Sequence, residues 1–309
     1  MIYTITLNPA LDRTIWVERI REDESNRIEE EHRYAGGKSI DVSKVLKNLG
    51  LDSVALGFVG GFAGRELEGR LLNEGIQSDF IRVSGETRIN IIIHEMETKH
   101  QVSFNARGPQ VQPHELMELV DQVSSLRNAE IITIGGSLPR GVTPEIIRKL
   151  ISMAKKGRAK VFLDVDGEAL KVGIEAGPHV IKPNIHELSH LLGRELTDIN
   201  DILAAAREIN QKGVEIVLVS MGGRGILMVT KDEEWIALPP QVEVKNTIGA
   251  GDSSVAGFIL GLVSEKQPKE CLAFAAAAGT ATTLSQGTAL CRKEDFDMIL
   301  PQVQLKELR

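Results

Sequence analysis

Residues 246–258, NTIGAGDSSVAGF, place small residues and one carboxylate directly before a stretch with the composition of a helix. A glycine-rich turn that opens a helix leaves several backbone N–H groups without partners, at the positive end of the helix dipole. Such a turn can bind a phosphate or stabilise negative charge that develops during a reaction. Asp252 stands in this turn. An acid at a helix start is also a common stabilising residue, so the segment alone leaves both roles open.

A second group of polar residues follows the apolar run HVI. The sequence KPNIHEL brings Lys182, Asn184 and Glu187 together in one short segment. Open α/β sheets bind their ligands beyond the carboxyl ends of parallel strands, so these side chains are candidates for a site. Glu187 can equally be a solvated acid in the first turn of a helix. The turns GFVGGFAG, GGSLPRG and VSMGGRG also follow apolar runs, but strand-to-helix turns favour glycine for backbone reasons alone.

The elements that must position these residues alternate along the chain. From residue 39 onward, helix-period segments alternate with the β-branched runs VALGFV, IITIG, VFLDV, HVIKP and IVLVS. This alternation predicts an α/β fold with a mostly parallel central sheet flanked by helices. Helices are expected at 39–50, 64–75 and 143–157, each ending at a glycine. We interpret residues 1–309 as a single domain.

Two segments break the alternation. Residues 14–34 and 80–106 contain no convincing helix, and RINIIIHEMETKHQVSFNA is typical of a hairpin that turns near Thr98 and Lys99. A parallel sheet flanked by helices does not need these strands. We therefore expect a small separate β-sheet, formed by about 13–35 and 80–107, that acts as a lid. Such a lid could cover a ligand or pair with a second copy of the chain.

Composition excludes several classes of function. The chain is 42% hydrophobic and 26% charged, and its formal net charge of -7 opposes binding to nucleic acid or to anionic membranes. The most apolar stretch, residues 271–284, is shorter than the ~20 residues that a bilayer requires and predicts a buried helix. The start shows no signal-peptide pattern, which favours a cytoplasmic location. Cys271 and Cys291 have neither disulfide-framework nor metal-ligand spacing, so we expect buried thiols.

The ordered set of motifs resembles a known family. TLNPALD, AGGKSIDVSKVLKNLG, TRINI, GGSLPRG, KPNIHEL, SMGGRG and NTIGAGDSSVAGF occur in the order of the PfkB branch of the ribokinase-like sugar kinases, over almost the whole chain. The segments TTLSQGTALC, GEAL and GRELT are most similar to the minor bacterial 6-phosphofructokinases. The opening AGGK and TLNPALD also suit 1-phosphofructokinases and tagatose-6-phosphate kinases. The resemblance implies an ATP-dependent kinase for a ketohexose phosphate, with fructose 6-phosphate to fructose 1,6-bisphosphate as the leading reaction.

The resemblance assigns catalytic roles to the GAGD turn. Asp252 would be the general base that accepts the proton of the attacking sugar hydroxyl, and Gly249, Ala250 and Gly251 would form the anion hole. A carboxylate is a weak base for an alcohol. A loose phosphoryl transition state needs little early deprotonation, however, so orientation matters more than basicity.

The nucleotide side follows from the same resemblance. Asn184 and Glu187 match an NxxE element that organises Mg²⁺ on ATP, through water, because magnesium keeps several waters and needs few carboxylates. The small side chains of residues 271–284 would let adenine lie close, although helix packing is the stronger single reason for them. Potassium is a further candidate cation, and the family implies a homodimer formed through the lid. The remaining candidates for nucleotide contact are Lys182, Ser220, Gly222 and Gly225.

The acceptor side needs hydroxyl acceptors and, for a phosphosugar, fixed cations. The candidates are Asp12, Gly36, Gly37, Lys38, Asp41, Arg88, Asn90, Arg107 and Arg140. Arg107 and Arg140 are also ordinary surface residues beside glycine or proline. The sequence GGKSIDV departs from the family pattern, since Ser39 and Asp41 stand where glycine and asparagine are usual. Asp41 can accept hydrogen bonds from sugar hydroxyls but cannot donate one as asparagine does, and it adds negative charge near an anionic substrate.

Three other functions are alternatives to a kinase of this family. A P-loop would need glycine where His32 stands before GKS, and a dinucleotide-binding fold would need GxGxxG after an early strand; neither pattern is present. A non-catalytic sugar-phosphate sensor on the same fold is the alternative of another class. The simultaneous presence of Asp252 and Glu187 argues against it, because a binding module could lose either acid.

Overall fold

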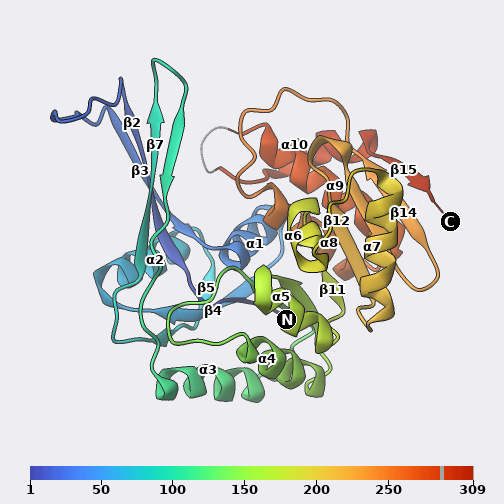
Figure 1. Cartoon of the computed structure of the whole chain (residues 1–309). Coiled ribbons are helices and arrows are strands. Elements are labelled where there is room, and N and C mark those ends of the chain that lie inside the picture. Colours follow the sequence, from blue (N-terminus) through green and yellow to red (C-terminus); the bar gives the residue numbers. More distant parts are fainter. Residues whose placement is uncertain (286–288, 309) are drawn as a thin grey trace.

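The computed structural model describes residues 1–285 and 289–308. Residues 286–288, which belong to the TTLSQGTALC segment, therefore lie outside the described residues. The described chain forms a large central sheet covered by helices on both faces, with a small second sheet projecting from one side (Figure 1). The α/β architecture expected from the sequence is confirmed.

The central sheet is parallel through most of its width and antiparallel at one edge. Its order is β15-β14-β13-β12-β11-β10-β9-β1-β4-β5, and β6 also pairs with β4. Pairing is parallel from β5 to β12 and antiparallel from β12 to β15. The strands are β1 (Ile2–Thr6), β4 (Ser53–Val59), β5 (Gln77–Ser78), β6 (Ile81–Arg82), β9 (Ile131–Gly135), β10 (Lys160–Asp164), β11 (Val180–Ile181), β12 (Ile216–Ser220), β13 (Ile226–Val229), β14 (Glu234–Leu238) and β15 (Gln304–Glu307).

Two apolar cores lie on the two faces of this sheet. One face is covered by α3, α4, α5 and α7, and the other by α1, α8 and α9. The helices are α1 (Lys38–Asn48), α2 (Gly61–Asn73), α3 (Pro113–Ser125), α4 (Glu145–Lys156), α5 (Gly167–Glu175), α6 (Ile185–Leu192), α7 (Ile199–Gln211), α8 (Ala250–Val263), α9 (Pro268–Thr283) and α10 (Lys293–Ile299), with short 3-10 turns η1 (Gly222–Arg224) and η2 (Leu300–Gln302). The predicted helix at 64–75 begins earlier, at Gly61. Within the described ranges, none of the helices has the length and apolarity needed to cross a bilayer.

The small sheet has the strand order β3-β2-β7-β8. Its strands are β2 (Ala10–Val17), β3 (Glu30–Gly36), β7 (Arg88–Glu95) and β8 (Gln101–Phe104). Strands β7 and β8 form the expected antiparallel hairpin around Thr98 and Lys99, while β2 pairs with β7 in parallel. The sequence therefore predicted a separate sheet correctly, although β2 begins at Ala10 rather than near residue 13.

Helices α8 and α9 pack unusually closely because glycines line their contact. A Cβ atom on Gly257 would lie 2.4 Å from the carbonyl oxygen of Phe274, and one on Gly279 would lie 2.3 Å from the Ser254 hydroxyl. Cys271 in α9 is buried and free, as is Cys291, and burial raises the pKa of the Cys271 thiol to about 11. The expectations of a buried helix and of buried thiols are confirmed.

Candidate active site

The carboxyl ends of four parallel strands gather the chemistry-bearing residues. In the pairing of β1, β9 and β10, Thr6 lies beside Gly135, and Gly135 lies beside Asp164. Lys182 follows β11, which is the next strand along. Helices α1 and α8 begin over the same edge (Figure 1). One edge of the sheet therefore holds residues that are far apart in the sequence.

The GAGD turn forms the start of α8. Gly249 is the N-cap residue and has φ 75°, a left-handed conformation that favours glycine, and a Cβ atom there would lie 2.3 Å from Leu290. Among the described residues, no side chain caps this helix end. The first-turn N–H groups of Gly251 and Asp252 consequently lack intrahelical acceptors and can receive an anion. Asp252 lies in this first turn, partly buried.

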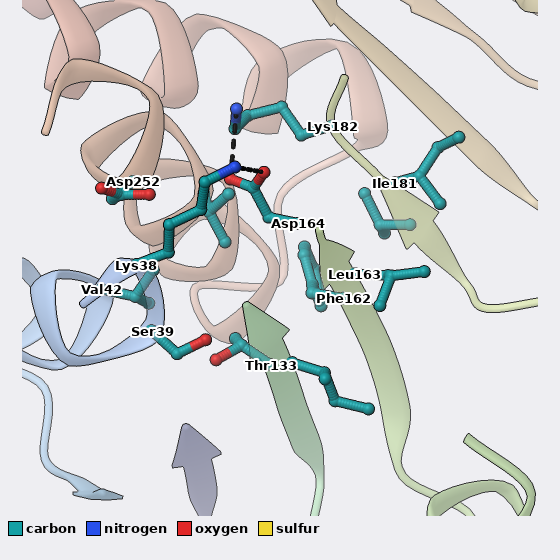
Figure 2. A pocket seen from close by; sticks show the side chains of 13 residues that line it. Lys38, Ser39, Val42, Thr133, Phe162, Leu163, Asp164, Ile181, Lys182 and Asp252 are labelled. Carbon is teal, nitrogen blue, oxygen red and sulfur yellow. Dashed lines mark hydrogen bonds and ion pairs between the residues drawn. The ribbon is translucent and has the colours of Figure 1, made fainter. Parts of the chain in front are cut away.

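An ion cluster lies beside Asp252. Lys38 Nζ donates a hydrogen bond to Asp164 Oδ1 at 2.9 Å, and Lys182 Nζ lies 3.2 Å from Asp164 Oδ2. Figure 2 shows the two ammonium groups converging on this carboxylate, with Asp252 on the far side of Lys38. These residues line what we call the charged pocket: Lys38, Asp164, Lys182, Asp252 and the apolar side chains beneath them. Lys38 Nζ also lies 3.6 Å from Glu187 Oε1.

The ionisable groups of this pocket shift one another's pKa values. Burial alone would raise the pKa of Asp164, but Lys182 and Lys38 hold it below its usual value. Burial would lower the pKa of Lys38, but Asp164 and Glu187 outweigh that effect and raise it. Burial raises the pKa of Asp252 well above its usual value, and the charges of Asp164 and Asp41 add to the shift. Asp252 is therefore the acid of the pocket that most readily holds a proton.

Sequence reasoning missed Asp164. Its carboxylate is 8% exposed and holds both lysines of the pocket. The available signal was an acid at the carboxyl end of the apolar run VFLDV, at the sheet edge where ligands bind. The ion pair between Asp164 and Lys38, however, joins residues 126 positions apart in the sequence and depends on strand register.

Asp12, near the start of β2, lies beside Gly36 at the end of β3, and Gly37 follows as the N-cap of α1. A Cβ atom on Gly36 would lie 2.1 Å from Asp12 Oδ2, so only glycine leaves room for this carboxylate. Gly37 has φ 131° and lies against Thr6. Asn90 Nδ2 donates to Asp12 Oδ1 at 2.7 Å. The predicted residues Asp12, Gly36, Gly37 and Asn90 are thus brought together.

Asp41 lies in the first turn of α1 and forms an ion pair that the sequence did not reveal. Its Oδ1 lies 3.6 Å from Lys44 Nζ, one turn further along the helix. Burial raises the pKa of Asp41 to about 7, with Lys44 opposing the shift and Asp12 adding to it. Burial also raises the pKa of Asp12, against the Asn90 hydrogen bond and the charges of Arg88 and Lys44. The two acids therefore face the same lysine.

The three predicted arginines have different surroundings. Arg88 donates to the carbonyl oxygens of Asn8, at 2.9 and 3.1 Å, and of Ala106, at 3.1 Å. Arg140 is exposed and donates to Gly108 O at 3.1 Å. The side chain of Arg107 is exposed, and its carbonyl oxygen accepts from Asn8 Nδ2 at 3.2 Å. These contacts fix the loop at 106–108, so much of the donor capacity of Arg88 serves the backbone.

A second hollow lies on the other side of the α8 start. Its cavity volume is about 290 Å³, close to the lower end of the size range of small-molecule sites. We call it the glycine-lined hollow: its lining comes from the η1 turn, the segment 239–244, the α8 start and α9. The predicted residues that line it are Ser220, Gly222, Gly225, Ala250 and Gly251.

Small residues of α9 and a proline-containing segment complete the glycine-lined hollow. Ala276, Gly279, Thr280 and Thr283 face it, in agreement with the expectation that residues 271–284 offer small side chains. The wall at 239–244, which begins with Pro239 and Pro240, was not predicted. The sequence LPPQV after an apolar run was the available signal.

The NxxE element forms the start of α6. Asn184 and Glu187 form a capping box, in which Asn184 Oδ1 accepts from Glu187 N at 2.8 Å and Glu187 Oε2 accepts from Asn184 N at 2.9 Å. Asn184 is also bridged to Ser220 at the end of β12. Glu187 therefore lies in the first turn of α6, as one of its two interpretations expects, but its side chain is only 19% exposed. Its second oxygen, Oε1, faces Lys38 and remains near the charged pocket.

The donor set suits a weakly held hard cation. Across residues 1–285 and 289–308, no group of three or more His, Cys, Asp or Glu side chains is placed to hold a metal by itself. Glu187 and Asn184 do supply oxygen atoms of the kind that magnesium prefers, and magnesium commonly keeps waters and phosphate oxygens as its other ligands. The residues present thus fit a magnesium ion that arrives with a phosphate ligand.

Comparison with known proteins agrees with this geometry. The family model described as pfkB family carbohydrate kinase matches residues 5–295. The chain is 34% identical over 308 residues to a 1-phosphofructokinase of Bacillus subtilis (strain 168), with 100% of both chains covered. It is also 34% identical over 309 residues to a D-tagatose-1-phosphate kinase of Bacillus licheniformis, again with 100% of both covered.

A solved structure shares the fold over nearly the whole chain. The phosphofructokinase-2 of Escherichia coli in complex with potassium has a TM-score of 0.94 at 35% identity, covering 97% of this chain and 98% of that one. The same enzyme in complex with fructose-6-phosphate has a TM-score of 0.91 at 33% identity, with the same coverage. These matches, together with the ordered motifs and their convergence on one sheet edge, show that the chain belongs to the pfkB family of carbohydrate kinases.

Proposed function

We propose that this kinase transfers the γ-phosphoryl group of ATP to a hydroxyl of a ketohexose phosphate, with fructose 6-phosphate as the first candidate acceptor. The observation that carries the proposal is the position of the α8 start. Asp252 and Val255 line the charged pocket, while Ala250, Gly251 and Ser254 line the glycine-lined hollow. A phosphoryl group at this helix start would lie between a nucleotide on one side and an acceptor on the other.

The α8 start supplies the groups that phosphoryl transfer needs. Asp252 accepts the proton of the attacking hydroxyl, and Gly249, Ala250 and Gly251 form the anion hole for the transferring group. In this turn the N–H group of Gly251 lacks an intrahelical acceptor, whereas that of Ala250 donates to Thr247 O at 3.3 Å. Lys182 supports the anion hole, because its Nζ would lie only 3.1 Å from a Cβ atom on Gly251. Lys38 brings a second fixed positive charge to the same place.

ATP occupies the glycine-lined hollow in this proposal. Adenine lies against the small residues of α9, and the phosphates extend past Ser220, Gly222 and Gly225 towards α8. Magnesium would be held by Glu187 and Asn184, through water, and when bound it neutralises phosphate charge. Potassium is a second proposed cation, supported by the potassium complex of the Escherichia coli relative.

The acceptor lies over α1 and the small sheet. Asp12, Asp41 and Asn90 bind its hydroxyls beside Gly36 and Gly37. Lys38 and the arginines at 88, 107 and 140 supply positive charge for its phosphate. Fructose 6-phosphate leads because the Escherichia coli phosphofructokinase-2 binds it. Fructose 1-phosphate is the second candidate, because relatives at 34% identity over the full chain are named 1-phosphofructokinase.

A substrate panel tests the proposal. The purified protein is incubated with ATP and magnesium and, in parallel, with fructose 6-phosphate, fructose 1-phosphate, tagatose 6-phosphate, tagatose 1-phosphate, fructose and inositol. We expect transfer to a ketohexose phosphate, with the phosphorylated carbon identified by NMR. Binding of a sugar phosphate without transfer to any member of the panel would favour the sensor function instead.

We also propose that residues 1–309 work as one kinase domain whose small sheet is a lid and a dimer contact. Ile89 and Phe104 are 43% and 57% exposed on neighbouring strands, and β3 and β8 leave free sheet edges. A second copy would cover this apolar surface. Sedimentation velocity is expected to show a dimer that Phe104→Asp weakens. A monomer in the unaltered protein would contradict this assembly.

A further inference from the structure

Two carboxylates on the acceptor side of the site share one lysine. Asp41 on α1 and Asp12 on β2 both face Lys44, which lies 3.6 Å from Asp41 and adds to the charge around Asp12. Lys44 Nζ also donates to the carbonyl oxygen of Ala35 at 3.2 Å. One ammonium group therefore serves two acids and a backbone oxygen.

The other cations near Asp41 pair with different groups. Lys38 and Lys182 both pair with Asp164, at 2.9 and 3.2 Å. Arg88 donates its hydrogen bonds to backbone carbonyl oxygens, although its positive charge still lowers the pKa of Asp12. Lys44 is thus the cation paired with Asp41 among the described residues.

Negative groups face Asp41 from three further elements. They are Asp12 on β2, Glu74 at the end of α2 and Asp252 on α8. The Asp41 side chain is only 18% exposed, so water screens these charges poorly. Burial, with Asp12 and Glu74, raises the pKa of Asp41 to about 7 against the pull of Lys44. Both protonation states are therefore populated at neutral pH.

We infer that Asp41 is a specificity residue that carries a proton when the acceptor is bound, so that capture of a sugar phosphate takes up a proton at this position. The arriving phosphate adds negative charge to a site already rich in carboxylates, which favours the neutral acid. A protonated carboxyl group can both donate and accept a hydrogen bond with sugar hydroxyls. The inference rests on the proposed function and deepens it.

The KM for the acceptor should rise with pH. Below pH 7 Asp41 is mostly protonated and the acceptor binds well, whereas above pH 7 binding must first return a proton to Asp41. If only the protonated form binds, the KM for the acceptor rises roughly tenfold between pH 6 and pH 8 from this group alone. Asp41→Asn, which is neutral at every pH and can donate, removes this rise.

The experiment measures the acceptor KM from pH 6 to pH 8 for the unaltered protein and for Asp41→Asn, with fructose 6-phosphate and fructose 1-phosphate. The ratio of the two KM values cancels the titration of the substrate's own phosphate. We expect this ratio to rise roughly tenfold across the range. Asp52→Asn is the matched control: this acid pairs with another α1 lysine, Lys47, at 2.8 Å but is 77% exposed. Its ratio is expected to stay constant.

Calorimetry provides a readout independent of turnover. Binding of the same sugar phosphates at pH 7.5, in buffers with different ionisation heats, reports the protons taken up per molecule bound. We expect greater uptake in the unaltered protein than in Asp41→Asn. A KM ratio that does not change with pH, or equal uptake in the two proteins, would overturn the inference. Failure of the proposed function is distinct, since it means no phosphoryl transfer to the panel whatever the pH.

Discussion

The two hollows that meet at the start of α8 are built on opposite principles. The glycine-lined hollow has no charged side chain among its described lining residues, which are small, apolar or neutral polar. The charged pocket places Lys38, Asp164, Lys182 and Asp252 within one small space. If both hollows bind ligands as proposed, one would select by shape and backbone contact, and the other by charge.

The difference indicates how each hollow should respond to substitution. Removing a charge from the charged pocket alters the groups around the reacting atoms, so the effect should fall mainly on turnover. Adding a small side chain to the glycine-lined hollow takes space from a ligand, so the effect should fall mainly on the KM for ATP. Three substitutions test this division of labour, beginning with the largest expected effect.

Asp252→Asn should have the largest effect. The amide keeps the shape of the side chain but cannot accept the hydroxyl proton, so kcat should fall on the order of a hundredfold or more while ATP binding is retained. Because burial, Asp164 and Asp41 raise the pKa of Asp252, kcat of the unaltered protein should increase with pH as this acid loses its proton. Steady-state kinetics with the identified acceptor, across pH, measures both effects.

A matched control separates catalysis from helix stabilisation. Glu145 occupies the first turn of α4 and is 66% exposed, so Glu145→Gln removes a first-turn acid far from either hollow. Its kcat should match that of the unaltered protein. Near-normal kcat in Asp252→Asn would show that Asp252 is only a helix-start acid, and the division between the hollows would lose its main support.

Asp164→Asn should have the next largest effect. It leaves the buried Lys182 and the half-buried Lys38 without their shared carboxylate, which should lower the free energy of unfolding by about 3 kcal/mol. Turnover should fall about tenfold, because the lysines lose their fixed positions beside Gly251. Chemical denaturation and steady-state kinetics measure the two effects.

The stability difference should depend on pH in a defined direction. The folded pKa of Asp164 is depressed, so its contribution is present above the unfolded value, ~3.9, and is lost as pH falls through the folded value. The unaltered protein and Asp164→Asn should therefore converge in stability at strongly acidic pH. Glu168→Gln, at a side chain 64% exposed beside Lys171, is the control and should change little. Equal stability of Asp164→Asn and the unaltered protein at neutral pH would contradict the cluster's role.

Features with a local signature could be predicted from the sequence. Apolar β-branched runs predicted the parallel strands, and the two segments without helix patterns predicted the small sheet. The glycine turn before α8 was recognisable because a positive φ and unpaired N–H groups have a compositional mark. Motif order then placed Asp12 beside Gly36 and Asn90 without any knowledge of distances.

Features that depend on strand register could not be predicted. Asp164 meets Lys38 only because β10, β9 and β1 pair in register beneath α1. Lys44 was missed for a different reason, since a lysine one turn along a helix is an ordinary residue until a buried acid faces it. The contacts of Arg88 could not be predicted either, because its hydrogen bonds to backbone carbonyl oxygens depend on how Asn8 and the loop at 106–108 fold against it.

Gly279→Ala should have the smallest effect and tests the glycine-lined hollow. The new methyl group would lie 2.3 Å from the Ser254 hydroxyl and 3.1 Å from Ala250 O, so α8 and α9 must separate. We expect the KM for ATP to rise several-fold with kcat nearly unchanged, and stability to fall by about 1–3 kcal/mol. Gly69→Ala in α2 is the matched control, because nothing lies within 4 Å of its Cβ position. There the stability should rise by about 0.5–1 kcal/mol and ATP kinetics should not change. If Gly279→Ala instead lowers kcat and leaves the KM for ATP unaltered, the hollow is coupled to the chemistry and the contrast between shape and charge does not hold.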